Sequence, residues 1–193
     1  MAEPKRIILG SGHFYVAEYD AAQTTLPTDS EIEKPENRLG FAKGGAELEY
    51  KPSFYEAKDD LGRVAKQIMT EEEALMKSGV MTLNASTLER LSSTARIDSS
   101  APTGKRIVKI GGIGNQNGKK YVIRFHHVDK ADGDIRITIV GNNQAGFTMA
   151  FEPDKETVVD VEFKALPMDD EGTLIIYEES DPTTDPEPDP EEP

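Results

Sequence analysis

The segment from Tyr121 to Val140, YVIRFHHVDKADGDIRITIV, decides the fold that we expect for this chain. In its first half, Tyr121, Ile123 and Phe125 alternate with residues that point to the opposite side of an extended chain. The Asp132-Gly133 dipeptide follows, and it is typical of a tight hairpin turn because glycine accepts a positive φ without steric cost. A second alternating run then ends at Val140. The segment therefore predicts two antiparallel strands, each with one face toward a core.

Similar short, alternating runs occur along most of the chain and are separated by glycine, asparagine and aspartate. One of them, Ala46 to Phe54, has a wettable face, and Pro52 within it favours an edge or a bulge. We expect a mainly β fold, a β-sandwich or partly closed barrel with one short flanking helix and a long loop in the N-terminal half. The predicted strands are Phe14–Tyr19, Ala46–Phe54, Glu71–Leu83, Ile107–Ile110, Tyr121–Val128, Ile135–Val140, Phe147–Phe151, Thr157–Lys164 and Thr173–Tyr177.

The one predicted helix, of about ten residues, begins at Ser86, where Ser86-Thr87-Leu88-Glu89 has the pattern of a capping box. An isolated helix of this length is marginal in water, so it needs a sheet on which to lie. The apolar stripe that would face the sheet consists of Leu83, Leu88, Leu91 and Ala95.

The chain length of 193 residues suits one domain with a substantial core. Residues 178–193 contain eight acidic residues, five prolines and no Lys or Arg, a composition that cannot bury apolar surface. We therefore expect a β domain over residues 1–177 and a disordered acidic tail over residues 178–193. A solvating or partner-docking role for this tail is the alternative.

The overall charge and composition argue against several function classes. With 36 acidic and 22 basic residues, the net charge of −14 opposes binding to nucleic-acid phosphates or anionic membranes. The absence of cysteine excludes disulfides, thiolate metal sites and a cysteine nucleophile. The apolar run Ile7–Leu9 is too short for a signal peptide or a membrane span, so we expect cytoplasmic synthesis.

Candidate catalytic and metal-binding motifs are weak. The glycine-rich stretch Gly111–Gly118 lacks the Gly-Lys-Ser/Thr that opens a helix in a phosphate loop, and we expect a hairpin loop there. His126 and His127 are adjacent and would point to opposite faces of a strand, which defeats chelation. Asp129, Asp132 and Asp134 lack the spacing of a calcium loop and are explained by the turn.

No pair of acidic residues is placed to act as acid and base, and we expect neither an enzyme nor a bound cofactor or metal. Lys105, Arg106, Lys109, Lys119 and Lys120 gather around the glycine-rich stretch. They could contact a small anion, or they could form a rim that pairs with acidic residues of a neighbouring copy.

Residues Gln23 to Gly45 form a segment with many turn-forming and few apolar residues. Loops of this length are uncommon in compact domains, so we expect it to be mobile or to be ordered against something outside its own domain.

Several blocks, in their order along residues 6 to 178, resemble the major tail protein, or tail tube protein, of tailed bacteriophages. Each block is weak alone, and their order carries the resemblance. The blocks are Arg6–Gly12 leading into Phe14–Val16, Asn37–Gly40 followed by Gly44–Ala46, Leu48–Pro52, Ile110–Asn115, Phe151–Thr157 and Asp170–Leu174.

This resemblance implies a β-sandwich or barrel with a flanking helix that assembles into hexameric rings, which stack head to tail into a hollow tube. It also implies DNA in transit through the tube without sequence-specific binding, and tape-measure, tail terminator and tail-tip proteins as partners. The place of action would be the virion tail, assembled in the bacterial host cytoplasm. By resemblance the long loop contacts neighbouring subunits and rings, and its candidate contact residues are Pro27, Asp29, Asn37, Arg38, Gly40, Gly44 and Gly45.

The alternative function is a monomeric β-sandwich that binds a small ligand or a carbohydrate, with the glycine-rich stretch and Tyr121 as its site. It would require a concave aromatic patch, whereas the chain has no tryptophan.

Overall fold

The computed structural model describes residues 12–20, 25–40, 42–81, 84–154 and 156–182. Strands dominate these residues, so the predicted mainly β fold is confirmed. The elements in chain order are β1 (His13–Tyr19), α1 (Asp29–Ile32), η1 (Pro35–Asn37), β2 (Ala42–Lys58), β3 (Val64–Val80), α2 (Ala85–Leu91), β4 (Arg96–Ile97), β5 (Val108–Lys109), η2 (Ile113–Asn115), β6 (Lys120–His127), β7 (Ile135–Asn143), β8 (Val159–Ala165) and β9 (Ile176–Glu179).

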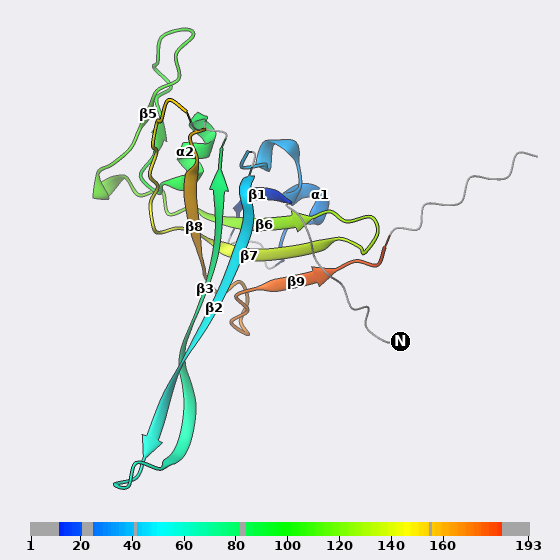
Figure 1. Ribbon diagram of the computed structural model, residues 1–193. Coiled ribbons are helices and arrows are strands. Elements are labelled where there is room, and N and C mark those ends of the chain that lie inside the picture. The colour runs from blue at the N-terminus through cyan, green and yellow to red at the C-terminus, as the bar shows by residue number, and fades with distance from the viewer. Residues whose placement is uncertain (1–11, 21–24, 41, 82–83, 155, 183–193) are drawn as a thin grey trace, which may run out of the picture.

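Seven strands form one antiparallel sheet in the order β1-β6-β7-β8-β3-β2, with β9 added beside β7. The sheet turns at β7, because its first half pairs with β9 and its last residues pair with β8. Figure 1 shows the result: β6, β7 and β9 run across the view, while β2, β3 and β8 cross them. The sheet thus folds over on itself into two layers.

Gly141 makes the turn between the two layers possible. It lies in β7 opposite Ala165 of β8, and a Cβ built on it would come within 1.9 Å of the carbonyl oxygen of Lys164. Only a residue without a side chain allows the two backbones to approach this closely.

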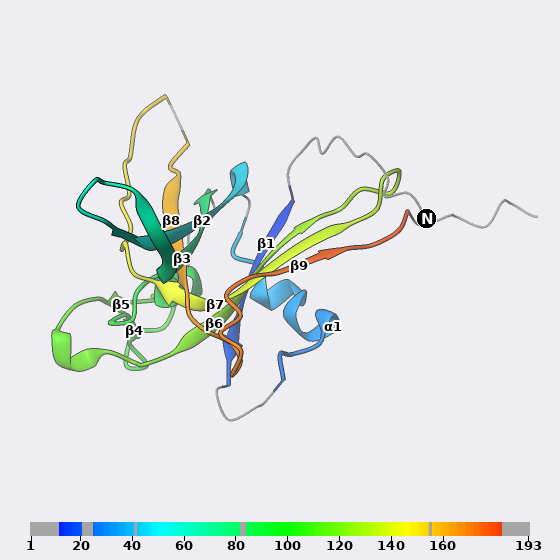
Figure 2. The same cartoon turned by 90° about the horizontal axis from the view of Figure 1, so that it is seen from below.

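The main hydrophobic core lies between the layers. Phe14 of β1 stacks on Phe163 of β8 with ring centroids 5.9 Å apart, and both rings are buried. A second, smaller cluster covers the other side of β1, β6 and β7, where Ile32 of α1 packs with Val122 and Val140. Figure 2 shows α1 on one side of these strands and β2, β3 and β8 on the other. Both faces of the β1-β6-β7 layer are therefore buried.

Helix α2 covers the core as predicted, but its cap differs from the prediction. Leu91 is fully buried in the main core. The N-cap is Asn84, whose side-chain oxygen accepts hydrogen bonds from the backbone N–H of Thr87 at 2.8 Å and from the hydroxyl of Ser86 at 2.6 Å. The predicted cap at Ser86 is wrong because asparagine two residues earlier caps the helix equally well. Leu83 of the predicted stripe lies outside the described residues.

Three predicted local structures differ from those observed: the strand Phe147–Phe151, the hairpin loop Gly111–Gly118 and the tight turn between β6 and β7. Phe147–Phe151 is not a strand, because the amide of Asn143 donates to the carbonyls of Leu91 and Gly146 and turns the chain after β7. The glycine-rich stretch is not a hairpin loop, because the strands on its two sides do not pair with each other: β5 pairs with β4, and β6 pairs with β1 and β7. The stretch instead connects the two sheets and contains η2.

The β6–β7 connection spans residues 128–134 and is longer than the predicted tight turn. Asp129 organises it by accepting hydrogen bonds from the backbone N–H groups of Ala131 and Asp132. Gly133 has a φ of 90°, which fits the conformational role predicted for it.

The predicted boundary at residue 177 falls inside strand β9, which continues to Glu179. In addition, the backbone N–H of Ser180 donates to the carbonyl of Asp134 at 2.9 Å. The folded body therefore extends past the first acidic residues of the predicted tail, because β7 offers them an open edge. Residues 183–193 lie outside the described residues.

Candidate assembly interface

The segment after β1 folds against its own domain. Its first helical turn, α1, is capped by Thr28, whose backbone N–H donates to the carboxylate of Glu31 at 2.8 Å. This bond and a second one from the Thr28 hydroxyl hold the pKa of Glu31 below its ordinary value. The side chain of Ile32 at the end of the turn is fully buried. A capped turn with one buried anchor thus replaces the predicted open loop.

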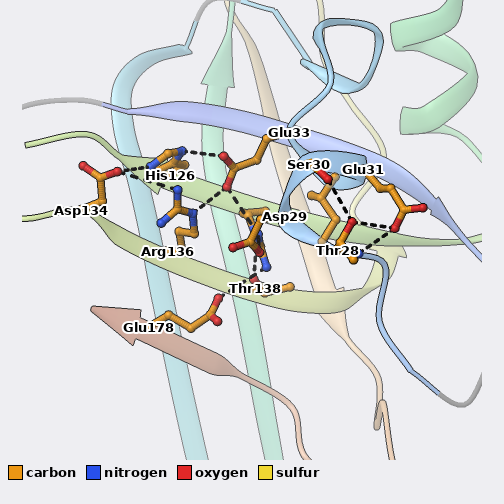
Figure 3. Close-up of polar contacts among 12 residues, drawn as sticks. Thr28, Asp29, Ser30, Glu31, Glu33, His126, Asp134, Arg136, Thr138 and Glu178 are labelled. Carbon is orange, nitrogen blue, oxygen red and sulfur yellow. Dashed lines mark hydrogen bonds and ion pairs between the residues drawn. The ribbon is translucent and has the colours of Figure 1, made fainter. Parts of the chain in front are cut away.

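A cluster of charged side chains fixes α1 to the sheet (Figure 3). Its centre is Arg124 of β6, whose side chain is only 4% exposed. The Arg124 guanidinium donates to the hydroxyl of Thr138 at 2.9 Å, pairs with Asp29, and lies 3.4 Å from carboxylate oxygens of both Glu33 and Glu178. This buried cation is therefore satisfied by three carboxylates from distant parts of the chain.

Glu33 links the two ends of the same cluster. One oxygen of its carboxylate lies 2.7 Å from Nε of Arg136, and the other lies 3.1 Å from Nδ1 of His126. Nε2 of His126 lies 3.0 Å from the carboxylate of Asp134. Figure 3 shows Glu33 reaching between the His126 and Arg136 side chains. Because these groups pair with one another, the cluster is a structural clamp rather than an open acid–base site.

The clamp shifts the ionisation of its carboxylates. The hydrogen bond from Arg124 lowers the pKa of Asp29, and the nearby positive charges of Arg124 and Arg136 act in the same direction. Burial opposes ionisation of Asp134, but its bonds to His126 and to the backbone of Asp129 still leave its pKa lowered. The ionised forms of both residues are therefore the ones that hold the clamp together.

The other predicted contact residues divide between two places. The Asn37 amide donates to the carbonyls of Glu31 and Ile32, and the Arg38 guanidinium lies 2.8 Å from Nδ1 of His13. With Pro27, Asp29 and Gly40 they belong to the segment between β1 and β2, whose turns α1 and η1 contact β1.

Gly44 and Gly45 are different, because they form a bulge in β2 where the pairing skips from Lys43 to Ala46. A Cβ on either glycine would meet nothing within 4 Å, so both are open to an approaching surface. The clamp orders the larger part of this segment against its own domain, which differs from a mobile loop or one ordered only by an outside partner. Contact of these residues with a neighbouring subunit stays a prediction.

The element that does project is the β2–β3 hairpin, which we call the arm (residues 46–78). Each strand of the hairpin has 17 residues and spans about 55 Å. Figure 1 shows its distal half extending well beyond the two-layer body. Its turn is built by Asp59, whose side chain accepts from the backbone N–H groups of Leu61 and Arg63, while Gly62 has a φ of 77°.

The arm changes character along its length. Near the body, Ala74 and Met76 of β3 are buried in the core, and Leu75 on the opposite face is buried as well. Beyond a register shift between Ser53 and Phe54, no described element covers either face. Apolar side chains are nonetheless present on both faces there, in the cross-strand pairs Phe54–Met69 (51% and 50% exposed) and Tyr55–Ile68 (59% and 50% exposed).

This arm tip (residues 53–71) is the most unusual surface of the molecule. Leu61 at the turn adds a further apolar side chain that is 78% exposed. A two-stranded ribbon with apolar residues on both faces is marginally stable in isolation and is a typical binding element. The alternating run at Ala46–Phe54 indicated the start of the arm, and the Asp59–Gly62 turn signal could have indicated its end.

A groove of about 470 Å³ lies at the opposite end of the same strands. The bulge residues Gly44 and Gly45, the side chains of Lys77 and Ser78, and Phe147 line it together with other residues. The hydroxyl of Ser78 donates to the carbonyl of Gly45 at 2.8 Å and stabilises the bulge. The sequence pointed to the two glycines but not to this groove.

Tyr121, which the ligand-binding alternative places in its site beside the glycine-rich stretch, is not an open surface residue. Tyr121 is buried in the main core, and burial raises the pKa of its hydroxyl. Ile113 of the glycine-rich stretch is, by contrast, 89% exposed. Within the described ranges, no three His, Asp or Glu side chains are arranged so that they could hold a metal ion. None of the helices in the same ranges has the length and apolar character needed to span a bilayer.

Comparison of the chain with models of known protein families and with curated proteins finds no match.

Proposed function

We propose that this protein is a structural subunit that assembles with copies of itself into stacked hexameric rings, and so into a hollow tail tube of a bacteriophage through which DNA passes. The observation that carries the proposal is the arm tip, with apolar side chains exposed on both faces of a ribbon that its own domain does not cover. A solvent-exposed ribbon of this kind is a liability for a monomer, and a partner that buries both faces removes it.

The sheet edges support self-assembly as well. β1 and β2 stand at the two ends of the strand order. The outer edge of β1 is bridged at Tyr15 by Arg38, which leaves the rest of that edge for pairing with another chain, whereas the outer edge of β2 pairs with no other described strand. Pairing the β2 edge of one copy with the β1 edge of the next is a head-to-tail contact. Repeated around an axis it closes a ring, and such closure removes the open edges.

The charge of the chain is compatible with DNA in transit. A net charge of −14 gives a tube that repels phosphates and does not retain the DNA. The proposal includes a tape-measure protein, a tail terminator and tail-tip proteins as partners, and the virion tail, assembled in the bacterial host cytoplasm, as the location.

The experiment that tests the proposal combines negative-stain electron microscopy with measurement of solution mass over a range of protein concentrations. We expect rings or tubes with six-fold symmetry. A monomer at every concentration that the protein can reach would contradict the proposal and favour the monomeric binding module.

A matched pair of variants tests whether the arm tip drives assembly. The first variant replaces the four paired apolar residues of the tip with serine, and we expect a monomer with an unchanged circular dichroism spectrum, because these side chains contact no core. The control replaces two exposed apolar residues elsewhere, Val128 and Tyr177, and should still assemble. The changes in the first variant are Phe54→Ser, Tyr55→Ser, Ile68→Ser and Met69→Ser.

A further inference from the structure

The molecule has a second cluster of exposed apolar side chains, in a segment that we call the basic projection (residues 96–120). It includes the small β4–β5 sheet and η2. Four isoleucines in this segment are exposed, led by Ile113 at 89%. The four are Ile97, Ile107, Ile110 and Ile113.

The basic projection and the arm carry opposite charge. Residues 96–120 include six Lys and Arg and a single acidic residue, whereas residues 46–78 include eight acidic and five basic residues. Lys105 and Arg106 are exposed, and neither has an acidic partner among the ion pairs of the described residues. Asp60 and Glu71 of the arm are likewise exposed and outside those ion pairs.

The two surfaces cannot satisfy each other within one copy. Figure 1 shows the segment around β5 at the top of the molecule and the arm tip at the bottom, with the two-layer body between them. A contact between them must therefore join two copies. Because the two surfaces differ, the contact is head-to-tail, and between stacked rings it repeats along the axis from one copy to the next.

The basic projection also offers a place for a large side chain. A pocket of about 320 Å³ lies at its base, lined by Asn84, Ala85, Ser86, Ile97 and Arg106. Most of its lining is apolar, and the guanidinium at its rim can lie against an aromatic face. Phe54 and Tyr55 are the exposed aromatic residues of the arm tip.

We infer that the basic projection is the acceptor for the arm tip of a second copy of this chain. Apolar contact between the isoleucines and the two faces of the tip supplies most of the binding, and pairing of Lys105 and Arg106 with the arm carboxylates fixes the direction. This inference rests on the proposed function, because it names the surface through which the subunits stack.

Charge reversal tests the inference in three variants. K105E/R106E makes the projection acidic, and D60K/E71K makes the arm basic; each should weaken assembly about tenfold or more, because like charges then face each other. The variant that combines all four changes restores opposite charges and keeps the net charge of −14. It should assemble like the original protein, as measured by sedimentation and electron microscopy.

A control separates a specific contact from an effect of total charge. K34E/K130E changes the net charge as K105E/R106E does, but both residues are exposed outside the arm and the projection. It should assemble normally. Loss of assembly in K34E/K130E, or failure of the combined variant to recover, would overturn the inference.

Cross-linking gives an independent measurement, because the chain contains no cysteine. Y55C and I113C proteins are mixed and oxidised, and a disulfide-linked dimer of one copy of each is expected, whereas either protein alone should give far less. If the original protein forms tubes but the mixture gives no such dimer and the charge variants assemble normally, the acceptor is wrong and the proposed function stands. If the original protein never assembles, the proposed function fails and the inference fails with it.

Discussion

The carboxylate of Glu33 lies 2.7 Å from Nε of Arg136, a residue that follows it by 103 positions in the sequence. Glu33 ends the helical turn α1 and Arg136 lies in β7, so this pair joins the segment after β1 to the middle of the sheet. The same carboxylate reaches His126 and Arg124. One side chain thus closes a clamp that a scan for local patterns does not reveal.

Replacing Glu33 with glutamine is expected to destabilise the fold by about 1–3 kcal/mol, because it removes the charge that balances two partly or fully buried guanidinium groups. Urea unfolding followed by circular dichroism measures the change. Glu36→Gln is the matched control, since Glu36 is exposed in the same segment and only its backbone carbonyl is used, by Arg90. Equal stability of the two variants would show that the clamp does not hold the segment.

The lowered pKa of Asp29 predicts how stability depends on pH. A carboxyl whose pKa is lower in the folded state contributes stability above its ordinary pKa of 3.8, and that contribution is lost as pH falls through the lower folded value. We therefore expect Asp29→Asn to be less stable than the original protein at neutral pH, with the difference shrinking below pH 3.8. Urea midpoints measured across this range test the sign, and a difference that is constant with pH would contradict it.

Gly141→Ala is expected to lower the free energy of unfolding by about 2–4 kcal/mol. The new methyl group would overlap the backbone carbonyl of Lys164, so the two strands would have to move apart. Thermal unfolding measures the loss. Gly114→Ala serves as the control, since a Cβ at Gly114 meets nothing within 4 Å. Similar melting temperatures for the two variants would mean that β7 and β8 do not pack as described.

The cap of α2 can be tested with two neighbouring substitutions. Asn84→Ala removes the oxygen that accepts from Thr87 and is expected to cost about 1 kcal/mol. Ser86→Ala removes only a donor to that oxygen, and a change of a few tenths of a kcal/mol is expected. The reverse order of effects in chemical unfolding would restore Ser86 as the cap.

Truncation separates the folded end of the chain from the acidic residues that follow. Ending the chain after Pro182 retains β9 and the contact of Glu178 with Arg124, and the stability of the body should be unchanged. Ending it after Tyr177 removes two residues of β9 and one partner of a buried cation, and a loss of about 1–3 kcal/mol is expected. Unfolding curves of both proteins give the comparison, and equal curves would place the boundary at Tyr177 after all.

Much of the fold could be predicted from local patterns. Period-two alternation located β1, β6, β7 and β8 to within a few residues, because one face of each strand meets a core. The prediction failed at Phe147–Phe151, where side-chain hydrogen bonds of Asn143 turn the chain. It also failed at the cap of α2, where both Asn84 and Ser86, two positions apart, are residue types that cap helices and only the backbone geometry chose between them.

The candidate site was predicted less well. Of the seven proposed contact residues, Gly44 and Gly45 lie open at the base of the arm, whereas Asp29 is paired with Arg124 inside the clamp. A segment with many turn-forming and few apolar residues has the same sequence pattern whether it extends into solvent or packs on its own domain. The difference lies in partners such as Arg124 and Arg136, about a hundred positions away.

By itself, the sequence determined that this protein is built mainly of strands around an apolar core, because alternation is a property of neighbouring residues. It also determined that the protein is strongly acidic, because composition is a property of the whole chain. Only the tertiary structure decided that the segment after β1 is clamped to the sheet while the β2–β3 hairpin projects. That choice depends on contacts between residues far apart in the sequence, and on the absence of a described element over the distal half of the arm.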